Sequence, residues 1–162
     1  MAMLFFAGRA MLLASAAATA ATEPDLEGRW QVRGEDPAQP AAIVRFDQVN
    51  GEYRGVIVSI PAAQGKSDEL RCTACSGSRR NQPLLKMEIV WGLKRQGLKY
   101  TGGSALDPET GETYRCDLTL APGGQELRIR YFVDPKHESV SEVWTREVQS
   151  RSARLRRPRT AS

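Results

Sequence analysis

Short segments in which apolar and polar residues alternate recur along this chain, and turn signals separate them. Two-residue alternation places every second side chain on one face of a strand, so it is typical of half-buried β-strands. Eight such segments cover residues 29–33, 41–49, 52–60, 84–91, 97–104, 112–121, 126–133 and 139–148. Regular short strands joined by turns predict an all-β protein, either a barrel or a sandwich.

Two tryptophan motifs bracket these segments and indicate that the sheet closes on itself. Gly28-Arg29-Trp30 lies at the first predicted strand, and Trp144-Thr145-Arg146 lies in the last. If these strands pair, the Arg146 guanidinium can cover the indole of Trp30, a contact worth roughly 0.5–2 kcal/mol. We therefore predict an eight-stranded antiparallel barrel, with Trp30 and Arg146 closing one end.

The dipeptide Asn50-Gly51 sets the register of the hairpin formed by the second and third predicted strands. This dipeptide is a strong signal for a two-residue type I′ turn. The turn pairs Phe46 with Gly55, so the glycine leaves room for the phenyl ring inside the barrel. A register slip of one residue would move every inward side chain to the outer face.

A second hairpin turns at the loop 122–125, which contains Pro, Gly and Gly. A four-residue loop pairs Leu118 with Ile129 inside the barrel and places Asp117 opposite Arg130 outside it. Opposite charges facing each other across two strands stabilise the pairing. We therefore predict this register for the sixth and seventh strands.

The inward side chains are the best indication of function. An eight-stranded barrel can just fill itself with side chains or hold one small ligand. The side chains expected to contact such a ligand are Phe46, Tyr53, Ile57, Met87, Trp91, Tyr114, Leu118 and Tyr131. Tyrosine hydroxyls among aliphatic side chains suit the polar end of an amphipathic molecule. A packed core without a cavity is the alternative.

One long irregular stretch, near residues 61–83, contains the motif Cys72-x-x-Cys75. We expect a disulfide that braces this loop, as in other exported proteins. A redox pair is the first alternative, but it requires a thiolate at a helix N-terminus, and no helical pattern follows. A zinc site with Cys116 and His137 is the second, although the spacing is not that of a zinc knuckle. We expect neither metal nor cofactor.

The first 20 residues predict a signal peptide, because they contain no acid, one base (Arg9), an apolar run and the small-residue motif Ala18-Thr19-Ala20. A disordered Ala-rich leader is the alternative. The predicted barrel domain then covers residues 21–148, and residues 149–162 form a disordered tail. We accordingly expect the mature protein in the periplasm or secreted.

The positive charge of the chain is concentrated in its tail. Net charge is +4, and residues 151–162 hold five Arg and no acid. Residues 21–150 hold 17 basic and 19 acidic residues, so the predicted domain is slightly acidic. A nucleic-acid-binding domain carries its positive charge on a folded face, so we expect no nucleic-acid partner. The tail is expected to be solvated, with weak contact to anionic lipid as the alternative.

Several motifs resemble a bacterial family of small exported proteins known as domain of unknown function 2147. The most specific is the run G-G-x-x-L-D-P-x-x-G-x-x-Y from Gly102 to Tyr114, which follows the Cys72-x-x-Cys75 motif. The resemblance spans about residues 27–147. It implies a lipocalin-like, calycin-type barrel in the periplasm or secreted space, and it brings no agreed activity.

The sequence contains no convincing set of catalytic residues. His137 lies near Ser139 and Ser141, but alternate strand positions do not create a catalytic triad. Asp107 and Glu109 lie in a turn, and we expect them to shape this turn rather than to perform acid–base chemistry. We therefore expect no enzyme. The first hypothesis is a carrier or sensor of a small apolar or amphipathic molecule, and the second is an envelope protein-interaction module with a filled barrel.

Overall fold

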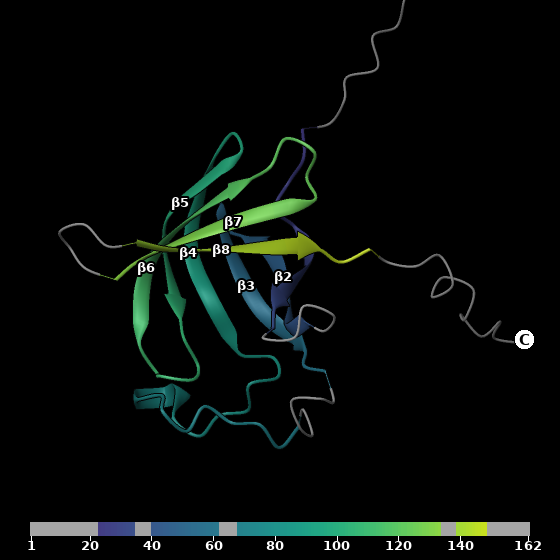
Figure 1. Cartoon of the computed structure of the whole chain (residues 1–162). Coiled ribbons are helices and arrows are strands. Elements are labelled where there is room, and N and C mark those ends of the chain that lie inside the picture. Colours follow the sequence, from purple (N-terminus) through teal and green to yellow (C-terminus); the bar gives the residue numbers. More distant parts are fainter. Residues whose placement is uncertain (1–22, 35–39, 62–67, 134–138, 149–162) are drawn as a thin grey trace, which may run out of the picture.

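The computed structural model describes residues 23–34, 40–61, 68–133 and 139–148. The predicted signal peptide (1–20) and basic tail (149–162) lie outside these residues. Eight antiparallel strands form a closed barrel in sequence order, and the last strand pairs with the first (Figure 1). The strands are β1 (Gly28–Arg33), β2 (Pro40–Val49), β3 (Glu52–Ser59), β4 (Glu88–Gln96), β5 (Lys99–Leu106), β6 (Thr113–Leu120), β7 (Glu126–Phe132) and β8 (Ser139–Arg146). The predicted fold class is confirmed.

Both predicted hairpin registers are present. Phe46 pairs with Gly55 across β2 and β3, and the turn uses positive φ angles of 53° at Asn50 and 84° at Gly51. A Cβ atom at Gly55 would lie 3.0 Å from the Phe46 ring, so the glycine makes room for that ring. In the β6–β7 hairpin, Leu118 pairs with Ile129 and Asp117 with Arg130.

The fourth and fifth strands lie further along the chain than predicted. β4 covers Glu88–Gln96 rather than residues 84–91, and β5 covers Lys99–Leu106 rather than residues 97–104. Lys86 has a φ angle of 72°, which interrupts extended structure before β4. The turn between the two strands contains Gly97 at a φ of 63°, a conformation that glycine adopts without the cost of a side chain.

A bulge in β4 changes which side chains reach the interior. Gly92 has a φ of 76°, and the register with β3 shifts between the pairs Tyr53–Leu93 and Gly55–Val90. An extra residue reverses the alternation of a strand. Val90 and Leu93 are therefore buried in the core, and the intervening residues Trp91 and Gly92 are only half-buried.

The core fills the end of the barrel that carries the β2–β3, β4–β5 and β6–β7 turns. Its largest fully buried side chains are Trp30, Tyr100, Phe46, Leu26, Leu93, Leu118, Leu120, Leu127 and Ile129. Burying a side chain of this size contributes roughly 1.5–3 kcal/mol. This half of the barrel is thus a packed hydrophobic core.

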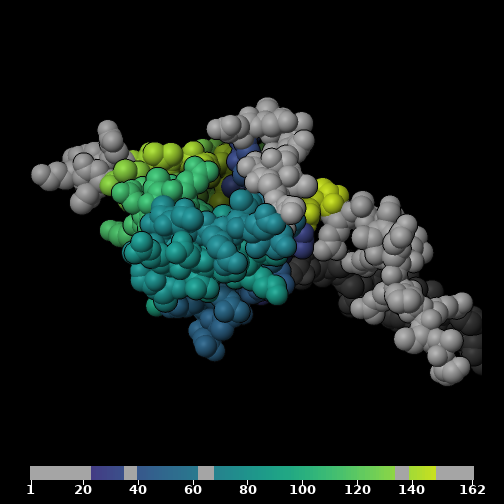
Figure 2. Space-filling view, turned by 90° about the horizontal axis from the view of Figure 1, so that it is seen from below, coloured from purple at the N-terminus to yellow at the C-terminus, as the bar shows by residue number. Residues whose placement is uncertain are grey.

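The segment 68–87 lies across the opposite end of the barrel, below it in Figure 1. Figure 2 views this end directly, with the teal atoms of the segment spread over it. The segment contains a short 3₁₀-helix, η2 (Gly77–Arg79). Among the described residues, no helix has the length and apolar character needed to cross a membrane.

Candidate functional site

The structure brings Trp30 and Arg146 together at the filled end of the barrel, where the two residues pair across β1 and β8. Trp30 is fully buried, and the Arg146 guanidinium lies 4.3 Å from the centroid of its ring. Arg146 also donates hydrogen bonds to the carbonyl oxygens of Gly124 at 2.6 Å, Asp25 at 2.6 Å and Glu27 at 2.8 Å. One side chain therefore closes this end and holds the segment before β1 against it.

Polar contacts of the segment before β1 complete this closure. The Tyr53 hydroxyl donates a hydrogen bond to the Asp25 carboxylate at 2.9 Å, and Arg95 donates to the same carboxylate. The Leu26 amide donates a hydrogen bond to the Tyr100 hydroxyl at 3.0 Å. Burial, helped by the hydrogen bond to Asp25, raises the pKa of Tyr53 to about 12. Tyr53 thus serves the closed end and stays protonated at neutral pH.

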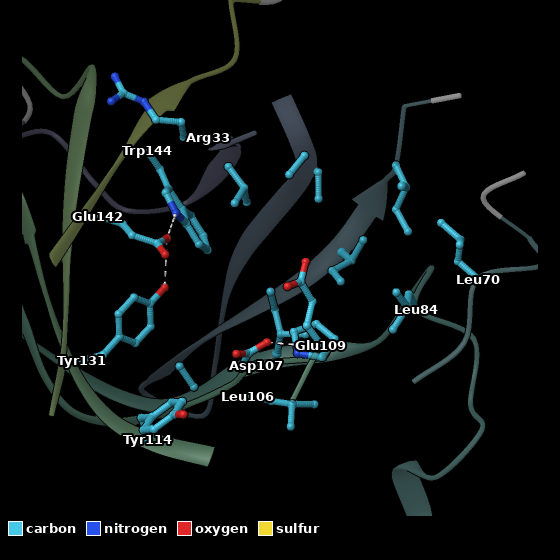
Figure 3. Close-up of a pocket in the computed structure, with 18 of the residues that line it drawn as sticks. Arg33, Leu70, Leu84, Leu106, Asp107, Glu109, Tyr114, Tyr131, Glu142 and Trp144 are labelled. Carbon is cyan, nitrogen blue, oxygen red and sulfur yellow. Dashed lines mark hydrogen bonds between the residues drawn. The ribbon is translucent and has the colours of Figure 1, made fainter. Parts of the chain in front are cut away.

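A cavity of about 690 Å³ occupies the other end of the barrel (Figure 3). Ligand pockets typically measure roughly 300–1,000 Å³. Much of its wall is apolar, from strands on several sides and from the segment 68–87: Val32, Ala42, Ile57, Ile60, Leu70, Leu84, Ile89, Ala105, Leu106 and Trp144. Its polar and charged lining residues include Arg33, Arg71, Asp107, Glu109, Tyr114, Tyr131 and Glu142. The barrel is therefore filled at one end and hollow at the other.

Only some of the side chains predicted to contact a ligand line the cavity. Ile57, Tyr114 and Tyr131 line the cavity. Four others are buried but are not among the described lining residues: Phe46, Tyr53, Met87 and Leu118. They belong to the hydrophobic core.

The predicted interior position of Trp91 is wrong. Trp91 pairs with Ser104, whereas the adjacent pair of Val90 and Ala105 points into the barrel. Directly opposite residues share a face, and neighbouring positions alternate. Trp91 therefore lies on the outer face, where the Arg79 guanidinium of η2 stacks 4.4 Å from its ring centroid. Two register shifts in the pairing with β3 are the physical cause, because each changes the alternation of β4.

Glu142 is a cavity residue that was not predicted from the sequence. Its Oε2 atom accepts hydrogen bonds from Trp144 Nε1 at 3.1 Å and from the Tyr131 hydroxyl at 3.4 Å (Figure 3). Burial raises the pKa of Tyr131 well above its ordinary value, and the negative charge of Glu142 is the second cause of this increase. Tyr131 is therefore a neutral hydrogen-bond donor to this carboxylate.

A signal for Glu142 was present in the sequence. Arg146 was expected to cover Trp30 at one end of the barrel interior, and strand side chains repeat every two residues. Trp144 and Glu142 must then share the face of Arg146. A glutamate on an inner face contradicts the usual preference for charged side chains outside, and the prediction followed that preference.

The loop with the two cysteines packs against the turn between β5 and β6. The predicted disulfide is confirmed, with Cys72 and Cys75 joined at a Cα–Cα distance of 5.3 Å. The Cys72 sulfur lies 3.3 Å from the Pro108 carbonyl oxygen. Gly111 approaches so closely that a Cβ atom there would lie 2.2 Å from the Ala74 carbonyl oxygen. The disulfide loop is thus fixed beside the cavity.

The remaining residues considered for catalysis or metal binding are Asp107, Cys116 and His137. Asp107 accepts hydrogen bonds from the amides of Glu109 at 2.8 Å and Thr110 at 3.4 Å, so it shapes its own turn. Cys116 is buried with a free thiol, and burial raises its pKa to about 12. Within the part of the chain that the structure describes, no group of three potential metal ligands lies together. His137 lies outside the described residues.

The family model described as "Uncharacterized protein conserved in bacteria (DUF2147)" matches residues 28–146. The chain belongs to the DUF2147 family. A solved structure titled "Protein HP1028 from the human pathogen Helicobacter pylori belongs to the lipocalin family" is similar in fold, with a TM-score of 0.62 and 21% sequence identity. The match covers 77% of this chain and 84% of that one. A search of curated proteins found no match. The barrel of this DUF2147 protein is therefore lipocalin-like, as predicted.

Proposed function

We propose that this DUF2147 protein is a carrier or sensor that holds a small apolar or amphipathic molecule in the barrel cavity. The observation that carries the proposal is the cavity of about 690 Å³, which has largely apolar walls and lies next to the packed hydrophobic core. Apolar walls with a few placed polar groups are typical of small-molecule sites. The lipocalin-like fold supports the same function, because eight-stranded barrels can hold one small ligand.

The proposed function is binding rather than catalysis. The lining carboxylates have partners that suit this role, since Asp107 holds its own turn and Glu142 accepts hydrogen bonds from two aromatic side chains. We further place the mature protein in the periplasm or outside the cell, on the strength of the signal-peptide pattern in residues 1–20. The Cys72–Cys75 disulfide fits an oxidising compartment.

The alternative function, an interaction module with a filled barrel, is less well supported. It requires side chains to occupy the interior at both ends, as they do around Trp30 and Leu127. The volume at the other end counts against it, because protein interiors are otherwise packed to crystal-like density.

Native mass spectrometry of protein purified without denaturant from its own host tests the proposal. We expect an adduct of small-molecule mass on the wild type. In Ala105→Phe a ring would enter the cavity, because Ala105 is buried in its lining. The matched control is Thr119→Phe, on an exposed position of β6. Loss of the adduct in the first variant alone supports the cavity as the site. A wild type without adduct, and without spectral change on addition of amphiphiles, would contradict the proposal.

A further inference from the structure

A carboxylate and two aromatic rings form one corner of the cavity. Glu142 lies on β8 opposite Ile129, which is fully buried, so its side chain is on the inner face of the sheet. Tyr131 and Trp144 flank it, and both donate to the same oxygen, Oε2. No described residue donates a hydrogen bond to Oε1. This corner therefore presents a negative acceptor between two aromatic side chains.

Basic side chains of the described cavity lining do not neutralise Glu142. None of the ion pairs among the described residues involves it. Arg33 is exposed, and its guanidinium extends away from the Glu142 carboxylate in Figure 3. Arg71 donates to the Asn81 carbonyl oxygen at 3.2 Å, within its own loop. Among the described residues, no cation therefore pairs with the carboxylate in this corner.

The aromatic rings favour a positive ligand group for a second reason. Aromatic faces carry negative electrostatic potential, and they attract ammonium groups with roughly 0.5–2 kcal/mol, the larger values where water is excluded. Both rings remain neutral at physiological pH, because the pKa of Tyr131 is raised and an indole does not titrate. A ligand that fills the cavity would displace water from this corner and strengthen the charge interactions there.

We propose that Glu142, Tyr131 and Trp144 form a subsite for a protonated amine, so that the ligand is an amphipathic cation with an apolar body. The ammonium group binds Glu142 between the two rings, and the apolar part lies against Ile57, Ile60 and Ile89 on the cavity wall. This inference rests on the proposed carrier function and specifies its ligand class. An anionic amphiphile such as a fatty acid is disfavoured, because its carboxylate would face that of Glu142.

Isothermal titration of n-octylamine, 1-octanol and octanoate at neutral pH tests the subsite, since the three probes share one alkyl chain. The amine is protonated at this pH, as a lysine side chain is. We expect wild-type protein to bind the amine about tenfold more tightly than the alcohol, and octanoate most weakly. Glu142→Gln should remove the preference for the amine and leave the affinity for the alcohol unchanged.

The matched control is Glu126→Gln, which removes the same charge from an exposed residue opposite Thr145 on the neighbouring strand. It should bind all three probes as the wild type does. Equal affinities of the three probes in the wild type, or an unchanged ranking in Glu142→Gln, would overturn the subsite and leave the carrier function standing. If none of the probes binds, the carrier function itself is contradicted.

Discussion

At the residue scale, Arg146 combines two tasks that a simple ion pair could not perform. Its guanidinium stacks on Trp30 and donates to three backbone carbonyls from two different segments. Gly28 makes this approach feasible, because a Cβ atom there would lie 2.7 Å from Arg146 Nη1. The first and last motifs of the sequence thus form one unit in space.

Arg146→Lys should lower the free energy of unfolding by about 1–3 kcal/mol. Lysine keeps the charge but has neither the planar group that stacks on an indole nor the fixed array of donors, and partly buried carbonyls would lose their partners. Urea denaturation measures the difference. The control is Arg130→Lys on the outer face, where the side chain donates to Ser139, and it should change stability by less than about 0.5 kcal/mol. Equal losses in the two variants would contradict the role of Arg146.

Cys116 should make the protein less stable in alkaline solution. Burial raises the pKa of its thiol from 9.0 to about 12, so the unfolded chain releases this proton first as pH rises. The folded state then binds more protons, and the free energy of unfolding falls above about pH 9, by at most about 1.4 kcal/mol per pH unit for this group. Tyr53, with a pKa raised to about 12 from 10.0, adds a similar loss above about pH 10.

Urea titrations at about pH 8, 9, 10 and 11 test this expectation. Cys116→Ala should remove most of the loss between pH 9 and 10 and keep the loss at higher pH, where tyrosines titrate. A wild type whose stability stays constant up to pH 10 would show that the thiol is not protected in the folded barrel.

At the element scale, the loop with the disulfide is positioned by its contact with the β5–β6 turn. Gly111 has a φ of 76°, and the Ala74 carbonyl occupies the space where a side chain would begin. The segment also contributes Leu70, Arg71, Thr73 and Leu84 to the cavity lining. The contact at Gly111 therefore helps to set the shape of the cavity.

Gly111→Ala should separate the disulfide loop from the turn. The added methyl group meets a backbone atom rather than a flexible side chain, a clash that costs about 1–3 kcal/mol beyond the conformational strain. Gly97→Ala is the control, because Gly97 has a similar φ of 63° but nothing lies within 4 Å of the position that an added methyl group would take. This control variant should therefore lose only the conformational strain energy of about 1–2 kcal/mol. Hydrogen exchange of the Cys72 and Asn81 amides should accelerate in the first variant alone. Equal exchange in both variants would show that the contact does not hold the loop.

Turn chemistry explains which elements the sequence could predict. Asn50-Gly51 and the loop 122–125 fix their hairpins locally, so both registers followed from the chain alone. The segment around Gly92 carries no such information, and its apolar residues at positions 89, 91 and 93 fit one regular alternation that places Trp91 inside. The pairing with β3 breaks this alternation, because Leu93 pairs with Tyr53 and Val90 pairs with Gly55. The placement of Trp91 outside and of Leu93 inside thus depends on tertiary structure.

The candidate site was likewise predictable only where turns set the register of the strands. Ile57, Tyr114 and Tyr131 were identified because they lie on strands with a register set by turns. Glu142 was not, because the alternation that places it on the inner face conflicts with the usual preference of charged side chains for the outer face. Composition could not distinguish a filled barrel from a hollow one, and the molecule is filled at one end and hollow at the other.

At the scale of the whole molecule, the two ends of the barrel should differ in local stability. β7 and β8 run the full length between them, so one pair of strands samples both ends. Glu126 and Thr145 pair at the packed end, whereas Phe132 and Ser139 pair beside the cavity. Sparse apolar contacts permit local opening at a lower free energy than global unfolding.

Native-state hydrogen exchange should resolve this difference. The Arg128 and Leu127 amides should exchange only through global unfolding, while the Phe132 and Val140 amides exchange faster through local opening. A bound amphiphile stabilises only the folded, closed state, by about 2.7 kcal/mol at a concentration a hundred times its dissociation constant. Adding n-octylamine at that concentration should therefore slow exchange at Phe132 and Val140 by up to about a hundredfold, because the local opening that exposes these amides would release the ligand. Uniform protection along both strands, with or without the ligand, would mean that the hollow end is as rigid as the filled one and that the cavity does not open to admit a molecule.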